Sequence, residues 1–219
     1  MIIKTDIFKN YCSTILNAVD TDGISALTET LEIKTFGKQL QLNVTNKDYY
    51  ARVNIAMDHE ELFHATVDAN LFLKLVSQTT SDTIDLSIDD KILKFKRNGT
   101  YKLPLIFEDT MLLNLPEINI NNITNSFNID GNVLSSINTF NTKQLLKGTI
   151  SQPVQKYYYV DQEGAITFTT GACVNSFRLP EPVRLLFNTK LVKLFSLYKN
   201  KNVKLELGHD ALTVTLIQT

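Results

Sequence analysis

Three histidines and two cysteines are the side chains of this 219-residue sequence that most readily support catalysis or metal binding. His59, His64 and His209 are scattered, and no H-E-x-x-H motif places two of them on one helix face. Cys12 and Cys173 stand alone, without the C-x-x-C spacing of a zinc or redox site. The sequence also lacks a phosphate loop, a G-x-G-x-x-G fingerprint and a G-x-S-x-G elbow. We therefore predict no catalytic residue, no metal and no other cofactor.

Adjacent carboxylates occur at Glu60-Glu61 and Asp89-Asp90, and paired acids can act as general acid and base. Acidic pairs of this kind are typical of solvated turns. Catalysis needs several groups that converge on one point, and nothing in the sequence indicates such a site. An enzyme is the least favoured interpretation.

The distribution of charge indicates a different chemistry, although the formal net charge is only -1 at pH 7. Four long stretches contain no Asp or Glu: residues 7–19, 69–81, 131–160 and 182–205. Eight lysines in these stretches are the predicted contacts to a polyanion, and they are Lys9, Lys74, Lys143, Lys147, Lys190, Lys193, Lys199 and Lys201.

Each acid-free stretch also contains a predicted helix. The first helix runs from Asp6, as its cap, to Val19, the second follows a cap at Asp68, the third begins at Val133 and the fourth follows Asn188. The residues predicted to face inward are Phe8, Cys12, Ile15, Leu16 and Val19, then Leu71, Phe72 and Leu75, then Val133, Leu134 and Ile137, and finally Leu191, Leu194, Phe195 and Tyr198.

Lysine is a good helix former that solvates an outer face, so one basic helix needs no functional explanation. Four acid-free helices on one side of a protein would present Lys, Asn, Gln and Ser to phosphates while the remaining surface stays acidic. Such contacts carry no sequence information. No aromatic residues interleave with these polar faces to stack unpaired bases, which favours duplex DNA over single strands.

Strands with period-two alternation surround the helices. A hairpin is predicted around Gly37-Lys38, where Leu40, Leu42 and Val44 form a half-buried strand, and another around Asn98-Gly99. Further strands are predicted at residues 84–88, 93–95, 101–107, 156–161, 165–170, 174–179, 203–207 and 212–216.

An internal repeat organises these elements. Residues 68–97 and 188–216 have the same order of cap, amphipathic helix, alternating strand, acidic turn and alternating strand, offset by 120 residues at the helix and 119 at the strands. We predict two domains, at residues 1–110 and 127–219, joined by a linker at 111–126. The fold class is α+β, and each domain is expected to be an antiparallel sheet backed by two helices.

The sequence resembles the DNA polymerase sliding clamps, and most closely the β subunit of bacterial DNA polymerase III. The resemblance is carried by residues 65–75, 85–89, 92–97 and 101–107 in the first repeat, and by residues 156–159, 165–171 and 188–198 in the second. It implies a processivity factor: a ring that encircles duplex DNA, is lined by the helices and tethers a DNA polymerase after a clamp loader has placed it.

Two departures from the family pattern affect the expected assembly. The bacterial clamps have three such domains in each chain, whereas two domains are found in trimeric clamps, so a homo-oligomeric ring is expected, and a trimer if two domains are the whole chain. The second repeat also lacks a strand after residues 212–216, whereas the first repeat continues through Asn98-Gly99 into the strand at residues 101–107. Either the natural chain continues beyond this sequence, or the strand is missing and the edge of residues 212–216 must be paired elsewhere, because an exposed strand edge invites association.

Family clamps bind peptide tails of their partners in an outer apolar groove. The matching positions are Thr169, Thr170, Gly171, Phe177 and Leu179, or alternatively the linker at residues 111–118. Two other functions remain open: an α+β protein of structural or assembly type, and an open processivity factor that grips DNA without closing a ring. No signal peptide or membrane segment is recognisable, so a cytoplasmic location, in a bacterium or phage-infected cell, is expected.

Overall fold

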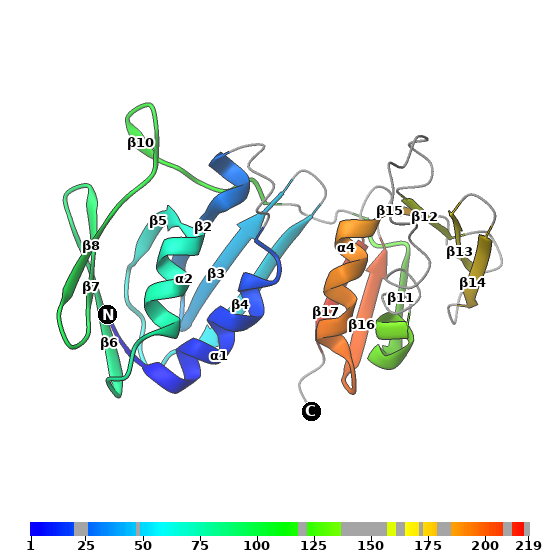
Figure 1. Cartoon of the computed structure of the whole chain (residues 1–219), viewed down its shortest axis with the longest axis horizontal. Coiled ribbons are helices and arrows are strands. Elements are labelled where there is room, and N and C mark those ends of the chain that lie inside the picture. The colour runs from blue at the N-terminus through cyan, green and yellow to red at the C-terminus, as the bar shows by residue number, and fades with distance from the viewer. Residues whose placement is uncertain are drawn as a thin grey trace. The chain divides into compact units, whose positions relative to one another are not determined.

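A computed structural model describes residues 1–19, 26–46, 49–117, 122–136, 157–160, 165–170, 173–178, 185–207 and 212–216. The chain divides into two compact units, Met1–Glu117 (unit 1) and Ile118–Thr219 (unit 2) (Figure 1). The predicted positions Lys143, Lys147, Gly171, Leu179 and His209 lie outside the described residues.

Unit 1 contains two four-stranded antiparallel sheets, with strand orders β4-β3-β2-β5 and β1-β6-β7-β8. The first consists of β2 (Thr30–Phe36), β3 (Gln39–Thr45), β4 (Tyr50–Ala56) and β5 (His64–Asp68), after a 3-10 turn η1 (Ala26–Glu29). The second consists of β1 (Ile2–Lys4), β6 (Thr83–Asp89), β7 (Ile92–Lys96) and β8 (Thr100–Pro104). The prediction of a single sheet per domain is wrong for this unit.

Two helices, α1 (Thr5–Leu16) and α2 (Ala69–Ser77), pack against each other, and α1 also lies on β3 and β4 (Figure 1). Asp68 caps α2 as predicted, because its Oδ1 accepts a hydrogen bond of 2.7 Å from the Leu71 amide. Asp6 does not cap α1. It lies inside the first turn, where a carboxylate still interacts favourably with the helix dipole.

The inward faces of these helices hold a core of aromatic rings. Phe8 meets Phe72 edge-on with the ring centroids 6.1 Å apart, and Phe72 meets Phe95 of β7 at 5.8 Å. All three side chains are fully buried, which ties both helices to the second sheet. Leu16 and Leu71, predicted to face inward, are about half exposed, while Leu73 and Val76 are buried on α2. The helix faces are therefore rotated slightly from the predicted positions.

The predicted hairpins are present. Gly37 and Lys38 form the two-residue turn between β2 and β3, and Gly37 has a φ of 55°, which favours glycine. Strand β3 is not half-buried as predicted: Gln41 and Asn43, on the face away from the helices, are buried together with the apolar residues. A second layer must therefore cover the outer face of this sheet.

That layer belongs to the predicted linker. After β8 the chain forms a small hairpin of β9 (Phe107–Glu108) and β10 (Met111–Leu112) and then crosses the outer face of the first sheet (Figure 1). Leu115 is buried in this crossing. The sequence patterns did not indicate β11 (Asn125–Asp130), which is the first strand of unit 2.

Unit 2 repeats the strand order of unit 1. One sheet has the order β14-β13-β12-β15 and the other β11-β16-β17, and these correspond to β4-β3-β2-β5 and to β1-β6-β7. The bounds are β12 (Tyr157–Val160), β13 (Ala165–Thr170), β14 (Cys173–Arg178), β15 (Leu185–Asn188), β16 (Asn202–Leu207) and β17 (Leu212–Leu216). In the described part of the chain, β17 pairs with β16 alone, whereas β7 pairs with both β6 and β8.

The helices of unit 2 occupy the same places in the order of elements. A helical segment at residues 131–136 follows β11, and α4 (Thr189–Leu194) follows β15 and continues as the 3-10 helix η3 (Phe195–Tyr198). Val192 and Phe195 are its fully buried side chains, whereas the predicted inward residues Leu191, Leu194 and Tyr198 are half-buried. The buried face of α4 is therefore shifted by one position, from Leu191 to Val192.

Candidate nucleic-acid interface

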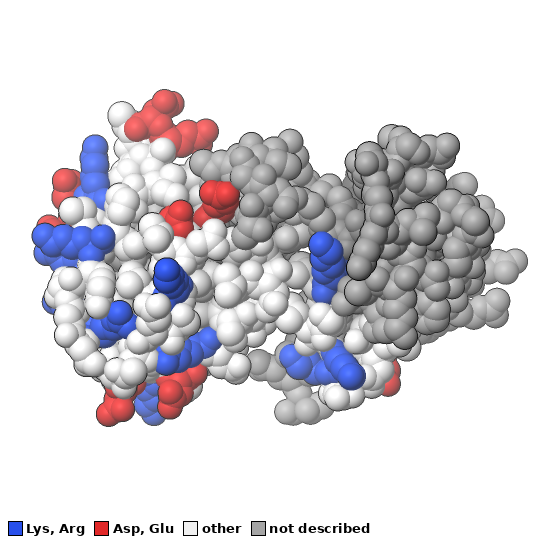
Figure 2. Space-filling model, viewed as in Figure 1, with Lys and Arg blue, Asp and Glu red and all other residues white. Residues whose placement is uncertain are grey.

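The helix lysines of unit 1 stand opposite its core. Lys74 lies in the last turn of α2 and is exposed, and Lys9 on α1 is half-buried. Phe8 and Phe72 of the same helices are fully buried. Figure 2 shows that the surface over α1 and α2 is mostly uncharged, with basic side chains standing on it singly. The sequence thus places cations, Asn, Ser and Gln on the face that the core leaves free.

The helix lysines of unit 2 are distributed over a helix and the turn that follows it. Lys193 is exposed in the last turn of α4, and the backbone of Lys190 lies in the same helix. Lys199 and Lys201 are exposed but come after the end of η3, on either side of Asn200, which has a φ of 60°. Lys199 therefore does not belong to the helix that carries Lys193, because η3 ends at Tyr198.

These helix and turn lysines differ from several strand lysines in their partners. Within the described residues, none of Lys9, Lys74, Lys193, Lys199 and Lys201 forms an ion pair. By contrast, four lysines on strands lie next to carboxylates, namely Lys34, Lys94, Lys96 and Lys204. The strand residues Lys4 and Lys102 have no such partner in that part of the chain. The unpaired helix and turn lysines keep their charge available for an external anion.

The predicted groove residues of unit 2 lie on two neighbouring strands. In the backbone register Thr169 and Thr170 of β13 stand opposite Val174 and Cys173, and Phe177 of β14 stands opposite Ile166. Phe177 is thus about three residues further along the hairpin than the two threonines. The alternative groove, residues 111–118, includes exposed Met111 and the segment that covers the first sheet.

The titratable side chains do not form a catalytic cluster in the described part of the chain. His59 is largely exposed and its Nε2 lies 3.7 Å from Glu61, whereas His64 Nε2 lies 3.1 Å from the buried Glu32. Burial raises the pKa of the Cys12 thiol well above its ordinary value, so Cys12 is a poor nucleophile. No group of three possible metal ligands occurs among the residues that the structure describes.

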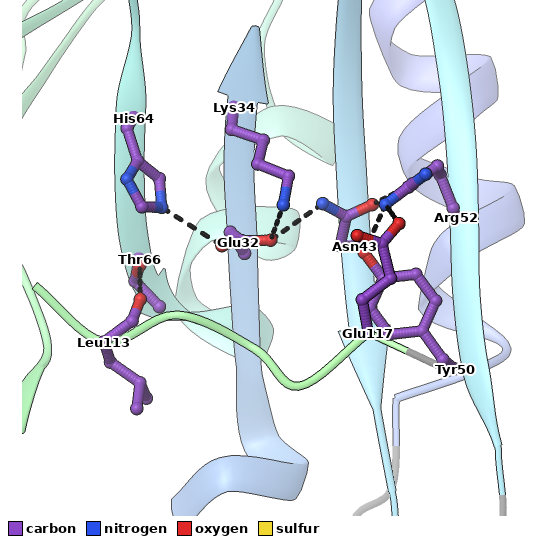
Figure 3. Close-up of polar contacts among 9 residues, drawn as sticks. All are labelled: Glu32, Lys34, Asn43, Tyr50, Arg52, His64, Thr66, Leu113 and Glu117. Carbon is purple, nitrogen blue, oxygen red and sulfur yellow. Dashed lines mark hydrogen bonds and ion pairs between the residues drawn. The ribbon is translucent and has the colours of Figure 1, made fainter. Parts of the chain in front are cut away.

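Beneath the crossing segment lies a buried polar row, Glu32, Asn43 and Thr66, which the sequence patterns did not indicate (Figure 3). A polar residue at an alternating position of a strand is usually solvated, so the pattern gave no signal of its burial.

The sequence matches no protein-family model and no curated protein. Its structure nevertheless matches solved structures of sliding clamps. The DNA polymerase III subunit beta of Pseudomonas aeruginosa matches with a TM-score of 0.77 at 14% identity, over 100% of this chain and 65% of that chain. The beta subunit of Thermotoga maritima gives 0.75 at 11% identity, over 100% and 64%. The Helicobacter pylori beta clamp bound to a DNA ligase peptide gives 0.71 at 14% identity, over 100% and 65%.

The chain therefore has the α+β fold of the bacterial DNA polymerase III beta sliding clamps along its whole length, and it spans about 65% of the length of those chains, which is about two of their three domains. At 11–14% identity this similarity concerns the fold. No helix in the described residues is long and apolar enough to cross a bilayer.

Proposed function

We propose that this chain is a sliding clamp, a non-enzymatic processivity factor that encircles duplex DNA and tethers a DNA polymerase during replication. The observation that carries the proposal is the position of unpaired lysines on the helices and the adjoining turn of a clamp fold. Lysine ammonium groups attract phosphates as point charges, without the bidentate base contacts by which arginine reads sequence. Attraction of this kind holds DNA and still permits sliding.

The proposed partners follow from the fold. Duplex DNA is bound without sequence specificity, and a polymerase and a clamp loader bind the outer surface. The Helicobacter pylori clamp binds a DNA ligase peptide, and we propose a comparable peptide site here, at Thr169, Thr170, Gly171, Phe177 and Leu179 or at residues 111–118. This function belongs in the cytoplasm of a bacterium or phage-infected cell.

A ring requires a closed number of copies, and a trimer is the expected number if two clamp domains, with a boundary near residues 111–126, are the whole chain. The mass in solution, measured by light scattering over a range of concentrations, tests this. A defined oligomer that persists on dilution is expected. A monomer at every concentration would contradict the ring and leave the open processivity factor.

Replacement of Lys190, Lys193 and Lys199 by Glu tests the DNA-facing surface. Binding should weaken equally for all duplex sequences, and the dependence of log affinity on log salt should flatten by up to about 0.9 for each lost phosphate contact. The matched control is the same charge change at exposed strand and turn positions, Lys38, Lys91 and Lys102. If both triple variants melt normally and give the same salt slope, the α4 helix is not the DNA-binding surface.

The proposal also expects no turnover by the chain itself. Hydrolytic or transfer activity that is lost on changing His59, His64 or His209 would contradict it. Stimulation of processive synthesis by the partner polymerase, without such activity, is the expected result.

A further inference from the structure

The turn that joins β7 to β8 consists of Arg97, Asn98 and Gly99, since Lys96 and Thr100 are the last residues paired across the two strands. Asn98 and Gly99 are exposed, and neither has a backbone φ in the left-handed region. A Cβ on Gly99 would have no neighbour within 4 Å. The local geometry therefore requires neither the conformational freedom of glycine at this position nor its small size.

The side chains of this turn pack at the C-terminal end of α2. Arg97 Nη1 donates to the Leu75 carbonyl at 3.4 Å, and its guanidinium lies over the Tyr101 ring, 4.5 Å from the centroid. Asn98 Nδ2 donates to Thr80 Oγ1 at 3.1 Å, which is the one hydrogen bond of this side chain in the described part of the chain. The Asn98 carboxamide is thus held at an exposed position by a single neutral hydrogen bond.

Asn98 and Gly99 together provide an electrophile and a nucleophile. The backbone nitrogen of Gly99 can attack the carboxamide carbon, Cγ, of Asn98, which closes a succinimide ring. The attack is intramolecular, so proximity favours it. Within the residues that the structure describes, the Gly99 N–H donates no hydrogen bond, and glycine has no side chain to hinder the approach. Both reacting groups are therefore accessible.

A second sequence of this kind, Asp130-Gly131, lies in the described part of unit 2 and is held differently. The Gly131 N–H donates to the Lys201 carbonyl at 2.8 Å, which engages the nitrogen that would attack. Asp130 Oδ1 accepts hydrogen bonds of 2.9 Å from both the backbone and the side-chain nitrogen of Asn132. Gly131 is also buried. Ring closure there first needs these contacts to break, so the two sequences should differ in reactivity in the folded chain.

We propose that Asn98 is a self-modification site, at which the folded chain loses ammonia and gains a carboxylate. The Gly99 nitrogen gives its proton to hydroxide and bonds to Asn98 Cγ, the Cγ–Nδ2 bond breaks, and Nδ2 leaves as ammonia with a proton from water. Water then cleaves one of the two carbon–nitrogen bonds of the ring. The product has aspartate or isoaspartate at position 98, and the chain becomes one charge more negative than its formal net charge of -1.

The modification is expected to release the turn from α2. A carboxylate at position 98 has no N–H to donate to Thr80, and its charge lies near the C-terminal end of α2, where the helix dipole is negative. Isoaspartate also adds one atom to the backbone next to the pairing of Lys96 with Thr100. These consequences do not depend on whether the chain binds DNA.

The test incubates the full folded chain, without DNA, at neutral and at mildly alkaline pH. Trypsin cleaves after Arg97 and Lys102 and so releases residues 98–102, in which mass spectrometry measures the conversion of amide to acid. An isoaspartate methyltransferase detects the isoaspartate product. A sample digested at zero time corrects for conversion during digestion.

Two controls isolate the proposed route. Gly99→Ala hinders the attacking nitrogen and has room for its Cβ, so it changes the reaction without changing the fold. Asp130-Gly131 is the internal control in the same digest. Asn98→Asp supplies one of the products directly, and hydrogen exchange of this variant measures the effect of the new charge on the turn.

Conversion at Asn98 is expected in the wild type, and it should be faster at alkaline pH because the Gly99 nitrogen attacks after it loses its proton. Gly99→Ala should slow the conversion about tenfold, equivalent to about 1.4 kcal/mol of activation free energy, with an unchanged melting temperature. Asp130 should stay unmodified until the chain is unfolded in urea. Asn98→Asp should increase amide exchange at residues 78–82 and leave unit 2 unchanged.

Four outcomes would overturn the inference. If Asn98 converts in a synthetic peptide of residues 94–104 but not in the folded chain, the fold protects it. Conversion of Gly99→Ala at the wild-type rate would exclude the ring route. Equal conversion at Asn98 and Asp130 in the folded chain would show that the hydrogen bonds around Gly131 do not decide reactivity. Unchanged exchange at residues 78–82 in Asn98→Asp would contradict release of the turn.

Discussion

The two units of this chain share their strand order but not the chemistry of their equivalent turns. In unit 1 the first residue of α1 is tied to the residue before β6, through a 2.9 Å hydrogen bond from the Thr5 amide to the Asp82 carbonyl. In unit 2 the Gly131 amide donates to the Lys201 carbonyl at 2.8 Å, at the equivalent place before β16. The backbone connection is the same, while the side chain at the acceptor changes from acidic to basic.

Backbone contacts and apolar positions preserve the repeat, which leaves the surface charge of each unit free to differ. The turn of unit 2 carries Lys199 and Lys201, where unit 1 has Thr80 and Asp82. Unit 1, in turn, has the buried polar row and the segment of residues 113–117 that covers it. The two units are therefore expected to respond differently to substitution.

The largest effect is expected from Glu32→Ala, which affects unit 1. The substitution leaves His64, Lys34 and Asn43 without their shared acceptor, and the loss of one partner in a buried charged cluster costs about 3–5 kcal/mol. Urea unfolding followed by hydrogen exchange of each unit measures this. Glu206→Ala, which breaks the partly exposed pair with Lys204 in unit 2, should cost about 1 kcal/mol or less. Equal losses in the two variants would contradict the difference.

The next effect concerns unit 2 and its tight turn. A Cβ on Gly131 would lie 2.0 Å from the Tyr198 carbonyl oxygen, so backbone must move to admit any side chain. Gly131→Ala should therefore cost about 3 kcal/mol, as an overpacked contact does. Gly99→Ala is the control in unit 1, because nothing lies within 4 Å of its Cβ. Thermal melting compares them, and a Gly131→Ala variant as stable as Gly99→Ala would disprove the clash.

A charge exchange between the two turns tests whether the difference matters for DNA. Lys199→Glu with Lys201→Glu should lower the salt slope of duplex binding by up to about 1.8, which is two phosphate contacts. Thr80→Lys with Asp82→Lys should raise it by up to the same amount, since both positions are exposed. Fluorescence anisotropy over a range of salt concentrations gives both slopes. No change in either direction would exclude these turns from the interface.

The smallest effect is a pH dependence of unit 1. The pKa of Glu32 is lower in the folded chain than its ordinary value, so its ionised form stabilises the fold above the unfolded pKa of about 4.3. This stabilisation is lost as the pH falls through the lower, folded pKa. The urea midpoint of the wild type should therefore decrease more than that of Glu32→Gln between pH 5 and pH 3. Parallel curves for the two variants would contradict it.

The sequence by itself determined the repeat, because periodicity and caps depend on neighbouring residues. Asp68 and the alternation of Leu93 and Phe95 indicate a helix and a strand that the structure contains, and the 120-residue offset indicates the shared topology. Residues whose position depends on distant partners were not predictable in this way. Leu71 appeared to be a core residue and is exposed, because the packing of α1 against α2 sets the rotation of each helix.

Only the tertiary structure determined which of the polar strand residues are buried. Glu32, Asn43 and Thr66 look like solvated strand positions in the sequence, since alternation cannot tell whether another segment covers the outer face. In the structure, residues 113–117 cover these side chains. This segment comes from a stretch of the sequence without periodicity. Leu113 lies 47 positions beyond Thr66, whose hydroxyl donates a hydrogen bond to its carbonyl. Burial and pairing of this kind arise from contacts distant in sequence, and so they appear only when the chain is folded.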